Sequence, residues 1–309
     1  MTSQKILLTG ATGFVGQEIL RQLPQQVRVF GRTKPARDCH FFAGELSANT
    51  DYRAALSGVD VVIHCAARAH VMNETATNAA ELYQDINTHA TLALAEQAAA
   101  SSVKRFIFIS TIKVNGGATE TGQMFRANDA RQPLDHYGES KAKAEIGLLD
   151  IAQKTGLEVV IIRPPLVYGP GVKANFAAML KLAKKNLPLP LGAIHNKRSM
   201  VALDNLVDLI VTCIEHPNAA NQIFLVSDDQ DVSTTELLEL MTRVAGKRAR
   251  LLPVPIAWLR LAGKVAGKEA IIDRLCGNLQ VDITHTKNIL SWHPPITVEE
   301  GVRRCFIKG

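Results

Sequence analysis

Short apolar runs alternate with longer helical stretches through the first half of the chain, and this rhythm limits the folds that it can adopt. The runs that predict strands are Lys5–Thr9, Val27–Phe30, His40–Ala43, Val61–His64, Arg105–Ser110 and Glu158–Arg163. Helices are predicted at Gln17–Leu23, Ala80–Ser101 and about His136–Thr155. Continuous apolar strands separated by helices indicate a parallel sheet that helices cover on both faces. Because such crossovers are right-handed, we expect an α/β protein with a doubly wound parallel (Rossmann) sheet.

The rhythm changes after residue 165, where proline begins to punctuate the sequence. Capping-box spacings at Ser233-x-x-Glu236 and Thr297-x-x-Glu300 predict two short helices. One further strand, Ile223–Val226, is expected to return to the main sheet. The predicted division is a first domain of residues 1–165 with a returning segment of about 199–227, and a smaller C-terminal α/β lobe of residues 166–198 and 228–309.

Composition excludes several classes of protein. Hydrophobic residues make up 47% of the 309 residues, which excludes a disordered chain, and the net charge of +6 suits an anionic ligand but is too diffuse to indicate nucleic acid. The five cysteines have no CxxC or zinc spacing, so we expect neither a disulfide framework nor a metal site. No apolar run is long enough for a signal peptide core or a membrane span. A soluble, cytoplasmic protein without a nucleic-acid or membrane partner is expected.

A glycine-rich turn, Thr9-Gly-Ala-Thr-Gly-Phe-Val-Gly16, lies between the first predicted strand and the first predicted helix. A doubly wound sheet places the pyrophosphate of a dinucleotide at this point, against a helix N-terminus. Gly10 permits the tight turn, Gly13 lets the backbone approach phosphate, and Gly16 allows close packing of helix on strand. The first domain is therefore predicted to bind a dinucleotide, with contacts from Gly10, Thr12, Gly13, Phe14, Val15 and Gly16.

The end of the second predicted strand bears on the choice between NAD and NADP. An acidic residue there suits the ribose of NAD, whereas arginine suits the 2′-phosphate of NADP. The sequence offers Arg32, Lys34 and Arg37, and the planar guanidinium of Arg32 is the best fork for a phosphate. NADP is therefore preferred, NAD remains compatible, and a solvated basic turn is the alternative interpretation. Glu45 and Leu46 are expected beside the adenine, although Glu45 is equally consistent with a surface carboxylate.

Tyr137 and Lys141 lie four residues apart in a predicted helix, so their side chains share one face. A free tyrosine has a pKa of about 10 and is a poor acid–base group at neutral pH. A lysine one turn away, together with a positive nicotinamide ring, would favour the phenolate. Ser110 and Thr111 end the fifth predicted strand, where loops converge on the cofactor. These residues together predict a hydride-transfer site.

The TGATGFVG turn, the Ser/Thr after the fifth strand, the YGESK segment and Arg163-Pro-Pro-Leu-Val-Tyr-Gly-Pro170 together resemble the extended short-chain dehydrogenase/reductases. More narrowly, the chain resembles the NAD(P)-dependent epimerase/dehydratase family, which acts on nucleotide sugars. The resemblance covers essentially the whole chain.

This resemblance implies a role for each matching residue. Tyr137 would be the acid/base, Lys141 would lower its pKa and hold the nicotinamide ribose, and Thr111 would hydrogen-bond the reacting oxygen. The remaining implied cofactor contacts are Cys65, Ala66, Ala67, Asn87 and Pro164. Implied substrate contacts, besides Thr111 and Tyr137, are Arg198 at the diphosphate and, as weaker matches, Asn175 and Arg274. For Arg274 a plain surface role is equally consistent.

Two departures from the family pattern narrow the predicted chemistry. Family 4,6-dehydratases carry an Asp-Glu pair directly after the catalytic threonine, whereas this chain has Ile112-Lys113. Family epimerases usually have an acidic residue where this chain has Arg32. We therefore expect a reductase of a UDP-4-keto-6-deoxy-N-acetylhexosamine in surface-polysaccharide (O-antigen) precursor synthesis, with a UDP-glucose or UDP-N-acetylglucosamine 4-epimerase as the alternative.

Two further expectations concern activity and assembly. A cofactor-sensing or scaffolding protein that has lost its activity is disfavoured, because the tyrosine, lysine and threonine positions are all filled. The family resemblance implies a homodimer in which helices 80–101 and 136–155 form a four-helix bundle. Their alanine-rich faces could equally pack on the sheet.

Overall fold

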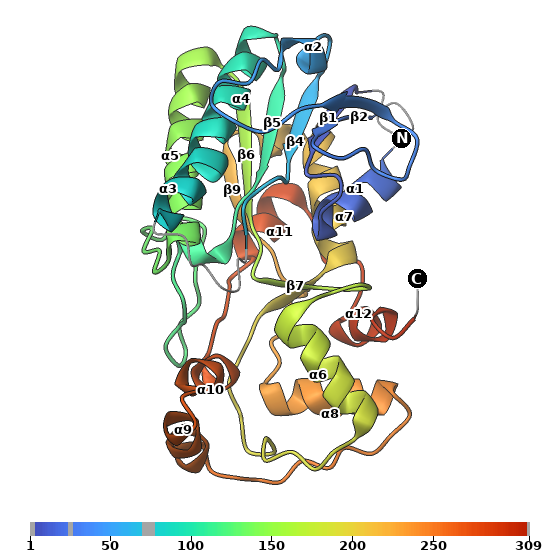
Figure 1. Cartoon of the computed structure of the whole chain (residues 1–309), viewed down its shortest axis with the longest axis vertical. Coiled ribbons are helices and arrows are strands. Elements are labelled where there is room, and N and C mark those ends of the chain that lie inside the picture. The colour runs from blue at the N-terminus through green and yellow to red at the C-terminus, as the bar shows by residue number, and fades with distance from the viewer. Residues whose placement is uncertain (1–3, 24–26, 70–77, 308–309) are drawn as a thin grey trace.

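The computed structural model describes residues 4–23, 27–69 and 78–307. A seven-stranded parallel sheet of order β3-β2-β1-β4-β5-β6-β9 dominates it (Figure 1). Its strands are β1 (Ile6–Thr9), β2 (Arg28–Gly31), β3 (His40–Ala43), β4 (Val61–His64), β5 (Arg105–Ile109), β6 (Glu158–Arg163) and β9 (Gln222–Leu225). The doubly wound α/β fold is confirmed, and the run predicted at 223–226 forms the seventh strand, paired in parallel with β6.

Helices cover both faces of the sheet because successive strand residues point to opposite sides. Leu7 faces one apolar cluster, which helices α2 (Arg53–Leu56), α4 (Ala90–Ala100) and α5 (His136–Thr155) complete. Ile6 and Leu8 face the other, which α1 (Phe14–Gln22), α7 (Leu203–Glu215) and α11 (Thr284–Leu290) complete. The sheet is thus buried on both sides, as the continuous apolar runs predict.

The long helix predicted at 80–101 is present but is not regular along its whole length. Its first part, α3 (Ala79–Gln84), passes into a π-helical turn at Asp85–His89 before α4 begins. A π turn widens the helix locally and often occurs at functional sites. Here it carries Asn87 and Thr88, both buried.

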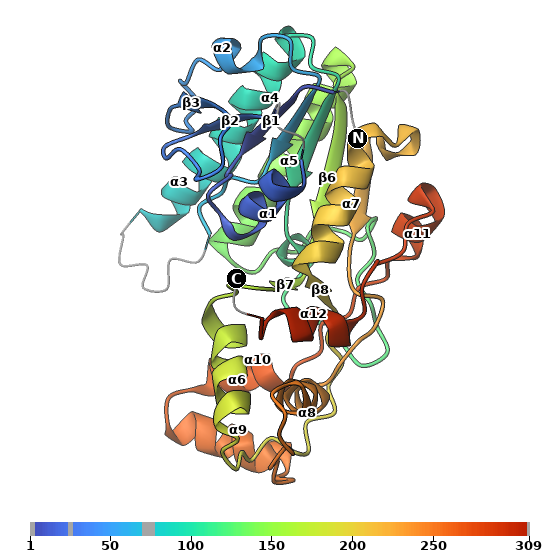
Figure 2. The same ribbon diagram turned by 90° about the vertical axis from the view of Figure 1, so that its right-hand side faces the viewer.

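The C-terminal lobe contains a small parallel sheet and several helices. Strands β7 (Leu166–Tyr168) and β8 (Met200–Ala202) pair, and the helices are α6 (Ala174–Lys185), α8 (Thr234–Val244), α9 (Ile256–Val265), α10 (Glu269–Cys276) and α12 (Val298–Arg304). Short 3-10 turns lie at Ile112–Val114 and Pro217–Ala219. Figure 2 shows β7, β8 and α12 between the main sheet and the remaining helices of the lobe.

The two predicted capping boxes open helices α8 and α12. At α8 the box is complete, because Ser233 accepts from the backbone of Glu236 and the Glu236 carboxylate accepts from the backbone of Ser233. At α12 the Thr297 hydroxyl accepts from the backbone of Glu300, whose carboxylate pairs with Arg304 instead.

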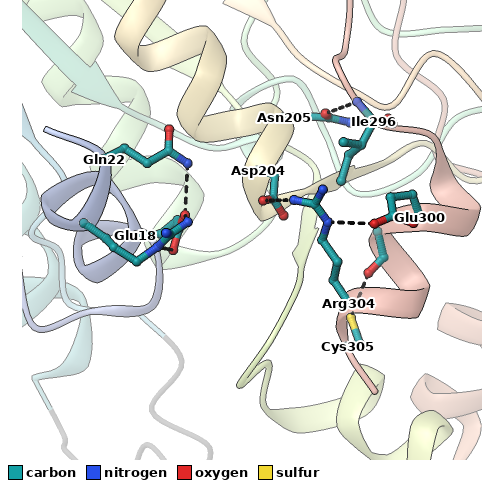
Figure 3. A network of polar contacts seen from close by, with 10 residues as sticks. Glu18, Gln22, Asp204, Asn205, Ile296, Glu300, Arg304 and Cys305 are labelled. Carbon is teal, nitrogen blue, oxygen red and sulfur yellow. Dashed lines mark hydrogen bonds and ion pairs between the residues drawn. The ribbon is translucent and has the colours of Figure 1, made fainter. Parts of the chain in front are cut away.

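The C-terminal helix is held to the returning helix α7 by a polar network (Figure 3). Arg304 on α12 bonds Asp204 at the start of α7, and Asn205 exchanges two hydrogen bonds with the backbone of Ile296. The five cysteines are free. Across the described residues, no helix has both the length and the apolar character that crossing a membrane requires.

Candidate active site

The glycine-rich turn after β1 is built so that two of its positions admit only glycine. Gly10 has a φ of +74°, and a Cβ there would lie 2.6 Å from the backbone nitrogen of Ala66. A Cβ at Gly16 would lie 2.1 Å from the carbonyl oxygen of Gly10. The turn is closed by a 2.9 Å hydrogen bond from the Gly13 amide to the same oxygen. These contacts match the roles predicted for Gly10 and Gly16.

The N-terminus of α1 suits an anion. Gly13 caps the helix in an extended conformation without a side-chain capping bond. The amides of Phe14 and Val15 follow in the first turn, where helix geometry provides no intrahelical acceptor. Gly13 and Thr12 are exposed, and among the described residues a Cβ at Gly13 would meet only the Gly10 oxygen, at 3.2 Å. Open backbone amides at a positive helix end fit the pyrophosphate of a dinucleotide.

A buried histidine fixes the loop that follows β4. His64 Nδ1 lies 2.7 Å from the hydroxyl of Thr9, and its Nε2 lies 2.9 Å from the hydroxyl of Thr91. Since Thr91 donates its single proton to the carbonyl of Asn87, Nε2 must carry the ring proton and Nδ1 must accept. Burial, and secondarily the charge of Lys141, lowers the pKa of His64 to about 3. The ring is therefore neutral and acts as a fixed link between β1, β4 and α4.

The predicted cofactor residues Cys65, Ala66 and Ala67 lie directly after this histidine and are half-buried. The Ala66 amide reaches the Thr9 hydroxyl at 3.4 Å. Burial raises the pKa of the Cys65 thiol to about 12, and the charge of Lys141 acts against that shift. The loop after β4 thus lies close to both the glycine turn and the lysine of α5.

The basic edge after β2 is less concentrated than the sequence suggests. Lys34 forms a 3.9 Å ion pair with Asp38, and Arg37 donates a hydrogen bond to the carbonyl of Leu20 on α1. Arg32 is exposed directly after β2. Of the three cations predicted to serve one phosphate, two thus have partners within the protein, and the Lys34 pair is a long contact between exposed side chains. Arg32 alone retains the predicted position.

The adenine contacts predicted after β3 differ in their surroundings. Glu45 is exposed, whereas Leu46 is half-buried and packs against the apolar cluster beneath α4.

Lys141 and Tyr137 occupy the first two turns of α5. The Lys141 ammonium is buried, donates a 2.8 Å hydrogen bond to the Ile109 carbonyl and lies 4.1 Å from the centre of the Phe108 ring. Burial lowers the pKa of Lys141 to about 7, against the opposing effects of Cys65 and Glu145. The lysine thus holds the end of β5 against α5.

The pKa of Tyr137 is shifted upward by its protein surroundings, whereas the sequence predicts a downward shift from Lys141 together with a bound nicotinamide ring. Burial raises the pKa of Tyr137 above its ordinary value, and Asp135 and Tyr83 add to the shift. The ring of Tyr83 lies edge-on at 6.3 Å between centroids, and the Lys113 ammonium lies 5.7 Å from the Tyr137 ring centre. Lys113 itself pairs with Asp135 at 2.5 Å. The ammonium of Lys141 donates its hydrogen bond to the Ile109 carbonyl, one helical turn from this phenol.

Two hydroxyl residues, Ser110 and Thr111, follow β5, and they have different hydrogen-bond partners. Ser110 donates a 2.6 Å hydrogen bond to Glu145, whereas Thr111 caps the short turn 112–114 by accepting from the Lys113 amide at 3.3 Å. The amide after Thr111 donates to the carbonyl of Pro164 at 3.0 Å, which joins the ends of β5 and β6. Ser110 is thus committed to the buried carboxylate, whereas Thr111 bonds within its own loop.

Asn87 connects the loop that follows β4 to the helix that carries Tyr137. Its Oδ1 accepts from the Arg68 amide at 2.8 Å, and its Nδ2 donates to the Arg68 carbonyl at 3.0 Å. The same Nδ2 donates to the hydroxyl of Ser140 at 2.9 Å, and Ser140 donates in turn to the Tyr137 carbonyl. An amide can make these contacts at once because it both donates and accepts.

The predicted substrate residues come from the lobe. Arg198 is half-buried and donates to the carbonyls of Arg274 and Gly277 at 2.9 and 3.2 Å, which neutralises the C-terminal end of α10. Burial lowers the pKa of Arg198. The structure thus brings Arg198 and the backbone of Arg274 together, with the Arg274 side chain exposed. Asn175 comes from a different element, the first turn of α6, and is exposed.

The sequence does not predict a buried ion pair that lies next to the site residues of α5 and β5. Glu145 and Arg163 form a two-point ion pair at 2.6 and 2.8 Å, and both side chains are almost fully buried. Arg131 and Asn115 complete the group. Glu145 follows Lys141 by one helical turn, which is the only signal of this group in the sequence.

The parallel sheet, the open helix N-terminus beyond β1 and the tyrosine–lysine pair on α5 are features of a dinucleotide-dependent enzyme. The chain belongs to the NAD dependent epimerase/dehydratase family, whose model matches residues 6–227.

A relative of high sequence identity agrees with this membership, and solved structures share the fold. The chain is 50% identical to the UDP-glucose 4-epimerase of Vibrio cholerae over 97% of its own length and 94% of that protein. The UDP-glucuronic acid 4-epimerase from Bacillus cereus, in complex with NAD, matches with a TM-score of 0.76 at 21% identity, over 97% and 96% of the two chains. RMD from Pseudomonas aeruginosa, complexed with NADPH, matches with a TM-score of 0.72 at 20% identity, over 98% of each chain. At such identities the two structures show a shared fold.

Proposed function

We propose that this protein is a 4-epimerase of a UDP-hexose or UDP-N-acetylhexosamine. The observation that carries the proposal is the 50% identity to a UDP-glucose 4-epimerase over nearly the whole of both chains. The rival function, reduction of a UDP-4-keto-6-deoxy-N-acetylhexosamine, was favoured by the basic edge after β2. That edge retains only Arg32 in the predicted position, since Lys34 and Arg37 have local partners.

We propose NAD as the cofactor, held at the pyrophosphate by the amides of Gly13, Phe14 and Val15. The half-buried loop 65–67 would line its path toward α5, and Lys141 would meet the nicotinamide ribose. When bound, the nicotinamide supplies a hydride acceptor that can return the same hydride, so an epimerase consumes no cofactor.

In this proposal Tyr137 is the general acid–base group for the C4 hydroxyl of the sugar. It takes the proton while C4 is oxidised and gives it back when C4 is reduced on the other face. Thr111 holds the C4 oxygen by a hydrogen bond in both half-reactions. Because burial raises the pKa of Tyr137, the phenolate requires a nearby cation, and Lys141 is the cation one helical turn away.

The lobe would supply the nucleotide end of the substrate site. Arg198 is assigned to the diphosphate, with Arg274 and Asn175 as further contacts. The proposed division of the chain keeps the predicted boundaries, residues 1–165 with 199–227 and residues 166–198 with 228–309. We further propose a cytoplasmic homodimer in surface-polysaccharide synthesis, joined through α4 and α5, where Ile146 on α5 is 56% exposed. Sedimentation velocity on the wild type and Ile146→Glu tests the dimer.

One assay separates the two reactions. The purified protein is incubated with UDP-glucose or UDP-N-acetylglucosamine without added cofactor, and the C4 epimer is followed by NMR. We expect the epimer to accumulate, and Tyr137→Phe should abolish it. Stoichiometric oxidation of NADPH with a 4-keto sugar, and no epimer from either UDP-sugar, would overturn the proposal in favour of the reductase.

A further inference from the structure

The α9 helix presents apolar side chains on the face that points away from the protein. Trp258, Leu261 and Val265 are 69%, 60% and 83% exposed and follow the i, i+3, i+7 spacing of one helix face. The opposite face packs inward through Leu259 and Gly263, which are buried. A helix that is apolar on both faces is normally covered on both. The outer face of α9 therefore requires a covering surface.

Two further apolar side chains are exposed in the segments that flank α9 in the sequence. Leu252, just before α9, is 53% exposed, and Ile271 on α10 is 50% exposed. Figures 1 and 2 both place α9 at the end of the molecule opposite the main sheet. A surface bound to this end of the molecule would leave the glycine turn and the main sheet uncovered.

The same segment holds most of the net charge of the protein. Residues 247–274 contain seven lysine or arginine residues and two acidic residues, and so carry five of the six net positive charges of the chain. Arg260 and Lys264 lie on the flank of the outer face of α9, and Lys268 follows the helix. Within this segment Arg260 pairs with Asp273 at 3.9 Å, while Lys264 and Lys268 are exposed. The covering surface is therefore expected to be negatively charged as well as apolar beneath.

We propose that the outer face of α9 docks on an anionic phospholipid bilayer. Trp and aliphatic side chains enter the boundary between headgroups and acyl chains, while lysine and arginine at the flank pair with lipid phosphates. An anionic bilayer offers both features over a broad surface, whereas nucleic acid offers charge without an apolar interior. This is peripheral contact and needs no membrane span. It revises the expectation of no membrane partner, and it does not depend on the reaction proposed above.

Docking also has a consequence for the substrate lobe. The C-terminal end of α10 provides the carbonyls that Arg198 binds, at Arg274 and Gly277. Contact of α9 and α10 with a bilayer thus brings the assigned diphosphate residues near the membrane surface while the cofactor sheet stays distant.

Vesicle flotation tests the proposal. The wild-type protein is mixed with vesicles of phosphatidylglycerol and phosphatidylcholine, or of phosphatidylcholine alone, at low and high salt. We expect binding to the anionic vesicles only, weakened by salt because screening reduces the lysine contacts. Trp258 emission should shift to the blue on binding, since the second tryptophan, Trp292, is already buried.

The key variant is the double substitution Leu261→Gln/Val265→Gln, which alters the outer face and keeps Leu259 and Gly263 in place. It should weaken vesicle binding by about tenfold or more, because two apolar side chains no longer enter the bilayer. Ile307→Gln, which changes a side chain 63% exposed near the C-terminus, is the matched control and should bind as the wild type does. Lys264→Gln/Lys268→Gln should reduce the preference for anionic vesicles.

Circular dichroism and urea unfolding establish that the variants are folded. Absence of binding to anionic vesicles at low salt would overturn the proposal. So would unchanged binding of Leu261→Gln/Val265→Gln. A larger oligomer in the wild type that this variant converts to a smaller one would show that a second copy covers α9 instead.

Discussion

Glu145 and Arg163 form a bidentate ion pair at 2.6 and 2.8 Å in the interior, between the middle of α5 and the end of β6. Glu145 also accepts a hydrogen bond from Ser110 at the end of β5. The Glu145 carboxylate thus links α5 to the ends of β5 and β6, next to the segments that carry Thr111 and Lys141. Loss of either partner would leave the other charge buried without a counter-charge. Single substitutions at this pair are therefore expected to displace the strand ends and the helix that carry the site residues.

Loss of the Glu145 charge is expected to destabilise the fold. Glu145→Gln leaves the buried Arg163 guanidinium without its counter-charge, which costs about 3–5 kcal/mol of unfolding free energy. Asp150→Asn is the matched control, since Asp150 forms an exposed pair with Lys154 on the same helix, worth about 0–1 kcal/mol. Urea unfolding measures both. Equal effects of the two substitutions would contradict the importance of the buried pair.

The fold was predictable where the sequence acts locally. Lys5–Thr9 and Glu158–Arg163 are apolar runs, so their strands follow from composition alone. Tyr137 and Lys141 share a helix face by their spacing. The Glu145–Arg163 pair joins residues 18 positions apart on a helix and a strand, and no local pattern announces it.

The electrostatics of the site were less predictable than its geometry. The sequence places Lys34 and Arg37 near Arg32, but it does not show that Asp38 and the Leu20 carbonyl engage them. The sequence predicts that the pKa of Tyr137 falls under the combined charge of Lys141 and a bound nicotinamide ring. It rises because burial, which depends on the packed structure, is the largest cause.

Gly16→Ala should destabilise the protein through the glycine turn. Its Cβ would lie 2.1 Å from the Gly10 oxygen, so α1 must move away from β1, at a cost of about 1–3 kcal/mol. Gly31→Ala is the control, because no atom lies within 4 Å of its added Cβ. Thermal and urea unfolding of the two variants test this. A Gly16→Ala protein as stable as Gly31→Ala would show that the turn accommodates a side chain.

Lys141 should make stability depend on pH. Its pKa falls from 10.5 to about 7 on folding, so between these values the unfolded chain binds the proton and the native protein does not. Stability contributed by this group therefore rises with pH across that window, with a slope of at most about 1.4 kcal/mol per pH unit. The buried charge is costly below the window and is relieved above it.

The comparison with Lys141→Met isolates this dependence from other groups. Lys141→Met has no titratable group at this position. The unfolding free energy of the wild type should therefore rise relative to that of the variant as the pH rises above about 7. Lys143→Met, at an exposed position on the same helix, should show a difference that does not vary with pH. A constant difference for Lys141→Met would mean that Lys141 keeps its ordinary pKa in the folded protein.

Tyr137→Phe should remove turnover and keep dinucleotide binding. General acid–base catalysis contributes about 10²- to 10⁴-fold, and the phenyl ring preserves the edge-on contact with Tyr83. Epimer formation from UDP-glucose measures turnover, and quenching of protein fluorescence measures NAD binding. Tyr83→Phe is the matched control and should retain most of the activity. Survival of turnover in Tyr137→Phe would move the acid–base role to another residue.

Arg32→Gln should reveal how the cofactor edge discriminates between NAD and NADP. Arg32 is exposed directly after β2, where a 2′-phosphate would stand, and the hydroxyl of NAD offers no charge to pair with it. A charge-assisted bond to phosphate contributes about 1.5–3 kcal/mol, so the substitution should weaken NADP binding by about 10- to 100-fold and leave NAD binding nearly unchanged. Lys34→Gln removes a neighbouring cation that already pairs with Asp38 and should change neither affinity by more than about twofold. Isothermal titration with both dinucleotides measures the four affinities, and an equal loss for NAD and NADP in Arg32→Gln would place Arg32 away from the 2′ position.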